Sequence, residues 1–219
     1  MFERPLTRRA WLGGAAVTAL GLAGLKPGPS SAASVSCILT PEQTEGPYYI
    51  AGEKLRRNIT EGRPGTPLLL RAFVVDATTC RAIRNAAVDI WHADAEGVYS
   101  GFGAGASSRT FMRGIQRTNA KGLALFRTVY PGWYQGRTVH IHVKVHVGGS
   151  VVHTGQLYFR DSLTDAVYRH TPYSARPNRD TRNTSDSVYR NGGSKSLLSV
   201  KKNSAGVYLA SIVMGVQRS

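Results

Sequence analysis

Residues 131–147 read PGWYQGRTVHIHVKVHV, and this stretch decides both the fold and the candidate site. From residue 139 onward, polar and apolar residues alternate, which predicts a β-strand over 139–147 with one face toward a core. Side chains two apart share a face, so His140 and His142 can reach one metal ion together. The same alternation also explains them as ordinary residues of the polar face. For His146, on the same face, no other observation supports a role as a metal ligand. A metal site therefore needs support from elsewhere in the chain.

The residues just before this strand form a loop. Pro131 and Gly132 are typical of a turn, so Tyr134 and Arg137 are expected on the loop that leads into the strand. This position brings a phenol and a guanidinium to the end of the strand that carries His140.

Other short stretches of the chain also have the composition of strands separated by turns. They are residues 68–76, 86–93, 112–117, 123–129 and 151–160, and a hairpin over 197–216 that turns at 203–206. Many short strands with few helical periods predict a mainly β chain, an antiparallel β-sandwich. Residues 34–67 form a polar N-terminal arm, 68–160 the core sandwich, and 161–219 a loop-rich C-terminal part.

The first 33 residues have the features of an export signal. Arg8 and Arg9 precede an apolar run over residues 10–25, and small residues follow through Ala33. Paired arginines indicate the twin-arginine route. The run is shorter than the roughly 20 apolar residues of a permanent span. We expect residues 34–219 to be exported to the periplasm or the exterior, with no stable membrane insertion after removal of the signal.

Two cysteines, Cys37 and Cys80, are present. In an exported chain, an even pair predicts one disulfide, which here would tie the arm to the body. A loop of this length contributes on the order of 4 kcal/mol to stability, mostly through the unfolded chain.

The chain is strongly basic, with a formal net charge of +15. Without residues 1–33 it keeps 24 basic and 12 acidic side chains. Such a field attracts anions, including phenolates and carboxylates. The basic residues are scattered and no nucleic-acid motif is present, so a nucleic-acid partner is not expected.

Tyr99 supplies the support that the histidines lack. Tyr99 follows the end of the predicted strand over 86–93, and Tyr134 precedes the start of the predicted strand over 139–147. Phenolate oxygen is a hard, anionic ligand that favours ferric iron, and imidazole suits several transition metals. Two tyrosines with two histidines therefore indicate an Fe(III) site.

With these residues, the chain resembles the intradiol ring-cleavage dioxygenases, the family of protocatechuate 3,4-dioxygenase and catechol 1,2-dioxygenase, and most closely their exported single-domain branch. The resemblance extends over about residues 37–160. It is carried by TPEQTEGPYY at 40–49, VDIWHADAEGVYS at 88–100, RGIQRT at 113–118, the run at 131–142, and QLYF at 156–159.

The resemblance implies one non-haem Fe(III) per chain, held by Tyr99, Tyr134, His140 and His142. It also implies insertion of both atoms of O₂ into a catechol, with cleavage between the hydroxyl-bearing carbons to a cis,cis-muconate-type diacid. By the same resemblance, Tyr134 takes up a substrate proton in addition to its role as a ligand.

Further roles follow from the same resemblance. Arg137 matches an active-site arginine that stabilises negative charge on the substrate ring. Gln156 matches a polar pocket residue, and Tyr48 and Tyr49 are expected to cover the pocket and touch the substrate. The chain departs from some members in the short spacing between Tyr134 and Arg137, which predicts a more open pocket. It also lacks the helical dimerisation region of cytosolic members, and the oligomeric state stays open.

Two alternatives belong to other classes. A non-catalytic prealbumin-like binding module would have the same architecture but no reason to hold four ligands and Arg137. A zinc enzyme using His140 and His142 would need a third histidine or a carboxylate, and would gain nothing from two tyrosines.

Overall fold

The computed structural model describes residues 38–102 and 105–217. The predicted signal over residues 1–33 and Cys37 lie outside the described residues. Export and the disulfide between Cys37 and Cys80 therefore stay predictions.

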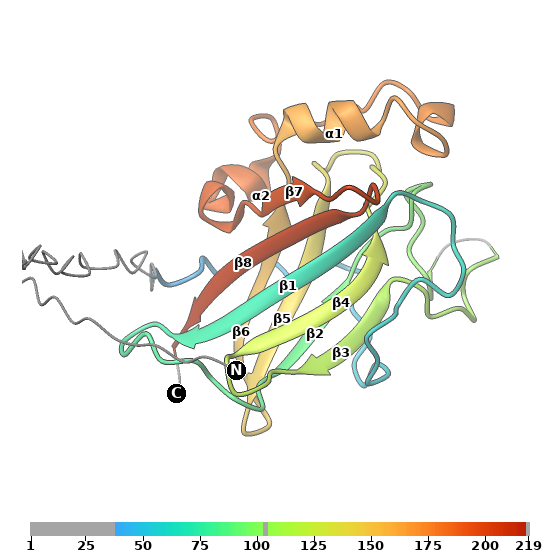
Figure 1. The fold of residues 1–219 in the computed structure, drawn as a ribbon. Helices are drawn as coiled ribbons and strands as arrows, with labels where there is room; N and C mark the ends of the chain where they lie inside the picture. Colours follow the sequence, from blue (N-terminus) through green and yellow to red (C-terminus); the bar gives the residue numbers. More distant parts are fainter. Residues whose placement is uncertain (1–37, 103–104, 218–219) are drawn as a thin grey trace, which may run out of the picture. The chain divides into compact units, whose positions relative to one another are not determined.

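In the described part of the chain, eight strands form two four-stranded sheets that face each other (Figure 1). The first sheet has the order β4 (Leu123–Val129), β1 (Pro67–Asp76), β8 (Tyr208–Val216), β7 (Ser199–Lys202). The second has the order β3 (Arg113–Arg117), β2 (Ala87–Trp91), β5 (His140–Val147), β6 (Ser150–Tyr158). The predicted β-sandwich is confirmed, and each predicted strand is found within a few residues of its expected ends.

The core lies between the two sheets and is built by alternation. Every second residue of β1 from Leu68 to Val74 is buried, and these residues join one apolar cluster with Ile141, Val143 and Val145 of β5. Packing of two inner faces in this way is what a sandwich requires. Because the odd-numbered residues of β5 face the core, His140, His142 and Lys144 face the opposite side of the second sheet.

One strand pair departs from the antiparallel pattern. β1 and β8 run parallel, with Leu70 opposite Ala210, while every other strand pair within the two sheets is antiparallel. Residues 77–207 connect these two strands, and a parallel neighbour needs a connection much longer than a hairpin turn. Strand alternation alone carries no information on this direction.

The segment between β6 and β7 holds short helical pieces at one end of the sheets (Figure 1). They are α1 (Asp161–Val167), η1 (Tyr173–Ala175), α2 (Ser187–Arg190) and η2 (Gly193–Ser196). The sequence predicted a loop-rich C-terminal part here, with residues 161–194 mostly surface loop, yet Asn183 and Asp186 are buried. Within the described ranges, none of the helices has the length and apolar character needed to cross a membrane.

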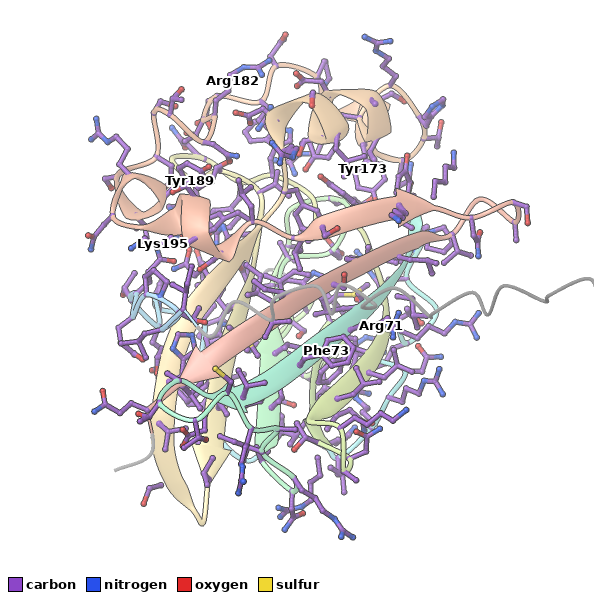
Figure 2. All side chains as sticks on the ribbon, turned by 60° about the vertical axis from the view of Figure 1, so that its left-hand side comes forward. Arg71, Phe73, Tyr173, Arg182, Tyr189 and Lys195 are labelled. Carbon is purple, nitrogen blue, oxygen red and sulfur yellow. The ribbon has the colours of Figure 1, made fainter. Side chains whose placement is uncertain are left out.

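The outer face of the first sheet carries the side chains of β1 that point away from the core. Arg71 and Phe73 lie there (Figure 2), with the guanidinium carbon 5.3 Å from the ring centre. This is a cation–π contact at an exposed arginine, so its contribution to stability is small.

Candidate functional site

The outer face of the second sheet is covered by part of the N-terminal arm, residues 42–49. Gln156 Nε2 donates to Thr44 O at 2.9 Å, Lys144 forms an ion pair with Glu45, and Gly46 lies directly against His142. As a result, His140 and His142 are buried. Alternation alone would also allow a half-buried strand with its polar face toward solvent. The structure differs because a segment about 100 residues earlier in the chain covers that face.

Four predicted ligands lie together on this covered face. His140 Nε2 is 3.0 Å from His142 Nε2 and 3.2 Å from Tyr134 Oη. The ring of Tyr99 is centred 5.5 Å from that of Tyr134 and 6.2 Å from that of His142. The chain thus brings two imidazoles and two phenols, from two loops and one strand, to one point.

The surroundings of both histidine rings favour the neutral form, and a hydrogen bond sets the tautomer of His140. His140 Nδ1 is 2.6 Å from Thr138 O, which can only accept, so Nδ1 carries the proton and Nε2 presents its lone pair. Burial lowers the pKa of His140 to about 3, with the Arg137 charge adding to the effect. Burial and the neighbouring His140 lower the pKa of His142 well below its usual value. Neutral imidazole is the form that binds metals.

The hydroxyl of Tyr99 is buried without a hydrogen-bond partner among the described residues. Burial, together with the nearby Tyr134, raises its pKa well above the usual value. Burial also raises the pKa of Tyr134, against the opposing effect of Arg137. A buried hydroxyl without a partner is costly, and a cation shared with Tyr134 and the two imidazoles would remove that cost. The donor set therefore fits a ferric ion.

The loop that carries Tyr134 contacts the loop that carries Tyr99 at Gly132. Gly132 N donates to Asp94 O at 2.8 Å, and a Cβ at residue 132 would lie 2.4 Å from Ala95 O. Real Cβ atoms do not approach backbone oxygens this closely, so only glycine fits. The turn expected from Pro131 and Gly132 thus also sets the distance between the two tyrosine loops.

Gly132→Ala is expected to lower the free energy of unfolding by about 3 kcal/mol, because the added methyl group must push the two loops apart. Urea denaturation measures the change. Gly148→Ala is the matched control: its methyl group meets open space, although its φ of 62° is left-handed, so we expect a loss of about 1 kcal/mol. Equal losses in the two variants would contradict the close-packing argument.

A cavity of about 230 Å³ opens beside the tyrosines and is lined by Tyr48, Gly97, Val98, Tyr99, Phe102 and Tyr134. Tyr48 stacks on Tyr99, with ring centres 4.3 Å apart. Tyr49 is not among the lining residues. Its ring lies 4.8 Å from that of Trp91 and 3.7 Å from Lys144 Nζ. Of the two arm tyrosines, the structure therefore brings Tyr48 to the cavity and uses Tyr49 in packing.

Arg137 lies beside the ligand cluster and is held by protein partners. Its Nε donates to Asp186 Oδ2 at 2.9 Å, and its Nη2 donates to Gln156 Oε1. Gln156 also accepts from Tyr158 Oη at 3.1 Å. Gln156, predicted to contact substrate, is thus hydrogen-bonded to the protein at both ends of its amide.

Two residues of the site were not predicted from the sequence, although Trp91 lies within the stretch 88–100 that carries the family resemblance. Trp91 stacks on His142, with ring centres 4.9 Å apart and planes 6° from parallel, and so fixes the plane of the imidazole. Asp186 comes from the predicted loop-rich C-terminal part and reaches the loop of Arg137. The hydrophobic periodicity of a strand predicts neither contact, because both are made across the tertiary structure.

The alternative of a zinc site requires a third histidine or a carboxylate beside His140 and His142. Within residues 38–102 and 105–217, no three histidine, cysteine, aspartate or glutamate side chains cluster to hold a metal ion. The residues that complete the group around His140 and His142 are tyrosines, which is the composition expected for ferric iron.

The chain is similar to known proteins over most of this region. Residues 44–177 match a family described as Dioxygenase. A curated relative, catechol 1,2-dioxygenase 2 of Acinetobacter lwoffii, is 36% identical over 107 residues, which are 45% of this chain and 38% of the relative. The chain spans 32–56% of the length of the curated relatives it matches.

Solved structures agree with this similarity. An intradiol ring-cleavage dioxygenase from Tetranychus urticae is 35% identical, with a TM-score of 0.79, and the match covers 83% of this chain and 95% of that one. The dioxygenase domain of a dioxygenase and carbohydrate-binding fusion from Streptomyces sp. SirexAA-E is 30% identical, with a TM-score of 0.64, covering 83% and 100%.

Proposed function

We propose, since this chain belongs to the intradiol ring-cleavage dioxygenases, that it uses one Fe(III) per chain to insert both atoms of O₂ into a catechol, with formation of a cis,cis-muconate-type diacid. The observation that carries the proposal is the group of two imidazoles and two phenols around His140 Nε2. Tyr99, Tyr134, His140 and His142 would hold the ion.

Ferric iron bound to these phenolates would accept both catechol oxygens and make the ring reactive toward O₂. The chain's own contribution begins with proton transfer. Tyr134 Oη lies within hydrogen-bonding distance of His140 Nε2, at 3.2 Å. As a phenolate, Tyr134 Oη can take one phenolic proton from the catechol and hold it as a neutral hydroxyl during turnover.

Arg137 supplies the positive charge. Its guanidinium acts on the pKa values of Tyr99, Tyr134, His140 and His142, so its field reaches all four side chains. Negative charge that develops on the substrate ring is stabilised by such a fixed cation, more strongly in a buried site than in water.

The cavity beside the tyrosines suits a flat aromatic ring. Tyr48, Val98 and Phe102 offer apolar contacts on its walls, and the Tyr48 ring stacked on Tyr99 is positioned for a further aromatic contact. These walls support a small catechol as the substrate class and leave the choice among ring substituents to experiment.

The protein loaded with iron is expected to be wine-red, through charge transfer from phenolate to Fe(III), and to consume O₂ with catechols. Visible spectroscopy, iron analysis and oxygen uptake with catechol, protocatechuate, hydroxyquinol and caffeate are the measurements. A colourless, iron-free protein after iron supplementation would overturn the assignment. Uptake with one member of the panel would identify the substrate.

A further inference from the structure

Asp186 is fully buried in the segment between β6 and β7, and its two carboxylate oxygens have separate partners. Oδ1 accepts from Tyr189 N at 2.8 Å, which caps the short helix α2, where Figure 2 marks Tyr189. Oδ2 accepts from Thr138 N at 2.7 Å and from Arg137 Nε at 2.9 Å. One side chain thus links α2 to the loop before β5.

The two residues that Asp186 holds in this loop both serve the candidate site. Arg137 carries the charge proposed to act on the substrate. Thr138 O accepts a hydrogen bond from His140 Nδ1 at 2.6 Å. Asp186 itself touches neither the cavity lining nor the four candidate ligands among the contacts of the described residues.

The guanidinium is fixed from two directions. Asp186 accepts from Nε and Gln156 from Nη2, while the described part of the chain gives Nη1 no hydrogen-bond partner. An arginine side chain has many rotamers, and two partners on different nitrogens select one orientation of its plane. The remaining nitrogen, Nη1, is then free to donate a further hydrogen bond.

We propose that Asp186 is a positioning residue for this reaction, which orients the Arg137 guanidinium toward the substrate and thereby acts on the rate of ring cleavage. The inference rests on the proposed function. The geometry favours this role over simple helix capping because one carboxylate oxygen is devoted wholly to the loop of Arg137 and Thr138.

The carboxylate is charged in the folded protein. Burial alone would raise the pKa of Asp186, but the backbone N–H groups of Tyr189 and Thr138 and the Arg137 charge outweigh burial and lower it. An amide in its place would lose the charge and also offer one acceptor oxygen where three donors converge. Asp186→Asn therefore weakens the hold on Arg137, through the lost charge and the lost acceptor, with little change in volume.

The first test compares iron-loaded Asp186→Asn with wild type. We expect kcat for the best substrate to fall about 10- to 100-fold, with KM changed by less than about threefold, because the interaction lost acts mainly in the transition state. Asp165→Asn is the matched control: Asp165 lies in the same segment and pairs with Arg179 and Arg182, but does not contact the loop of Arg137. Its kcat should match that of wild type.

A double-mutant cycle separates positioning from a structural role. In an Arg137→Ala background, Asp186→Asn should change kcat by less than about twofold, because the arginine through which it acts is already absent. An equal loss in both backgrounds would show that Asp186 acts independently of Arg137 and would overturn the proposal.

A measurement independent of activity completes the test. In full-length protein loaded with diamagnetic Ga(III), NMR should show slow hydrogen exchange of Arg137 Nε–H in wild type and Asp165→Asn, and at least tenfold faster exchange in Asp186→Asn. Exchange in wild type as fast as at the exposed Arg190 would overturn the positioning role without any variant. Absence of O₂ uptake by iron-loaded wild type would instead overturn the proposed function.

Discussion

Replacement of Tyr134 by phenylalanine is expected to lower kcat by about 1,000-fold or more. The change removes one hydroxyl and leaves the ring, so the packing against Tyr48 and Tyr99 is kept. It removes both a candidate iron ligand and the oxygen proposed to take a substrate proton, and general-base catalysis alone is commonly worth 100- to 10,000-fold. Single-turnover oxygen uptake under saturating catechol measures the loss.

Tyr130→Phe is the matched control for Tyr134→Phe. Tyr130 is also buried, but its hydroxyl is 2.7 Å from Thr164 Oγ1 in the core and away from the site. We expect this variant to lose about 1 kcal/mol of stability and to keep its colour and turnover. Normal ring cleavage by Tyr134→Phe would show that another group accepts the proton.

His140→Ala is expected to abolish iron binding under conditions that saturate wild type. His140 Nε2 lies within 3.2 Å of both His142 Nε2 and Tyr134 Oη, so its loss removes the central ligand of the group. Loss of outer partners of a metal ligand alone weakens binding about 10- to 100-fold, and loss of the ligand itself should exceed this. Iron content after gel filtration and the visible band are the measurements.

His146→Ala separates the ligand role from the effect of losing any histidine of β5. His146 lies on the same strand and face, but it is only partly buried and lies six residues beyond His140. This variant should keep the iron content and the colour of wild type. Loss of iron in His146→Ala, or its retention in His140→Ala, would show that the ligand set is wrong.

Much of the fold could be predicted because strand alternation is a local property. Residues 123–129 were predicted as a strand from their composition, and β4 has the same bounds. The parallel direction of β8 beside β1 was not predictable, since it depends on how a long segment crosses the end of the sheets. The burial of the polar face of β5 does not follow from the alternation of the strand itself, because the covering arm is distant in sequence.

The candidate site divides in the same way. That His140 and His142 share a strand face, after Tyr134 and Arg137, follows from the amino-acid order alone, because residue spacing within a strand and its loop fixes these relations. The three-dimensional packing was needed to show that Tyr99 meets Tyr134, that Tyr48 and not Tyr49 lines the cavity, and that Asp186 holds Arg137. Those contacts join residues 35 or more positions apart, or depend on how the arm packs. They are set by the packing of whole sheets and segments, and a local sequence pattern carries no information on that packing.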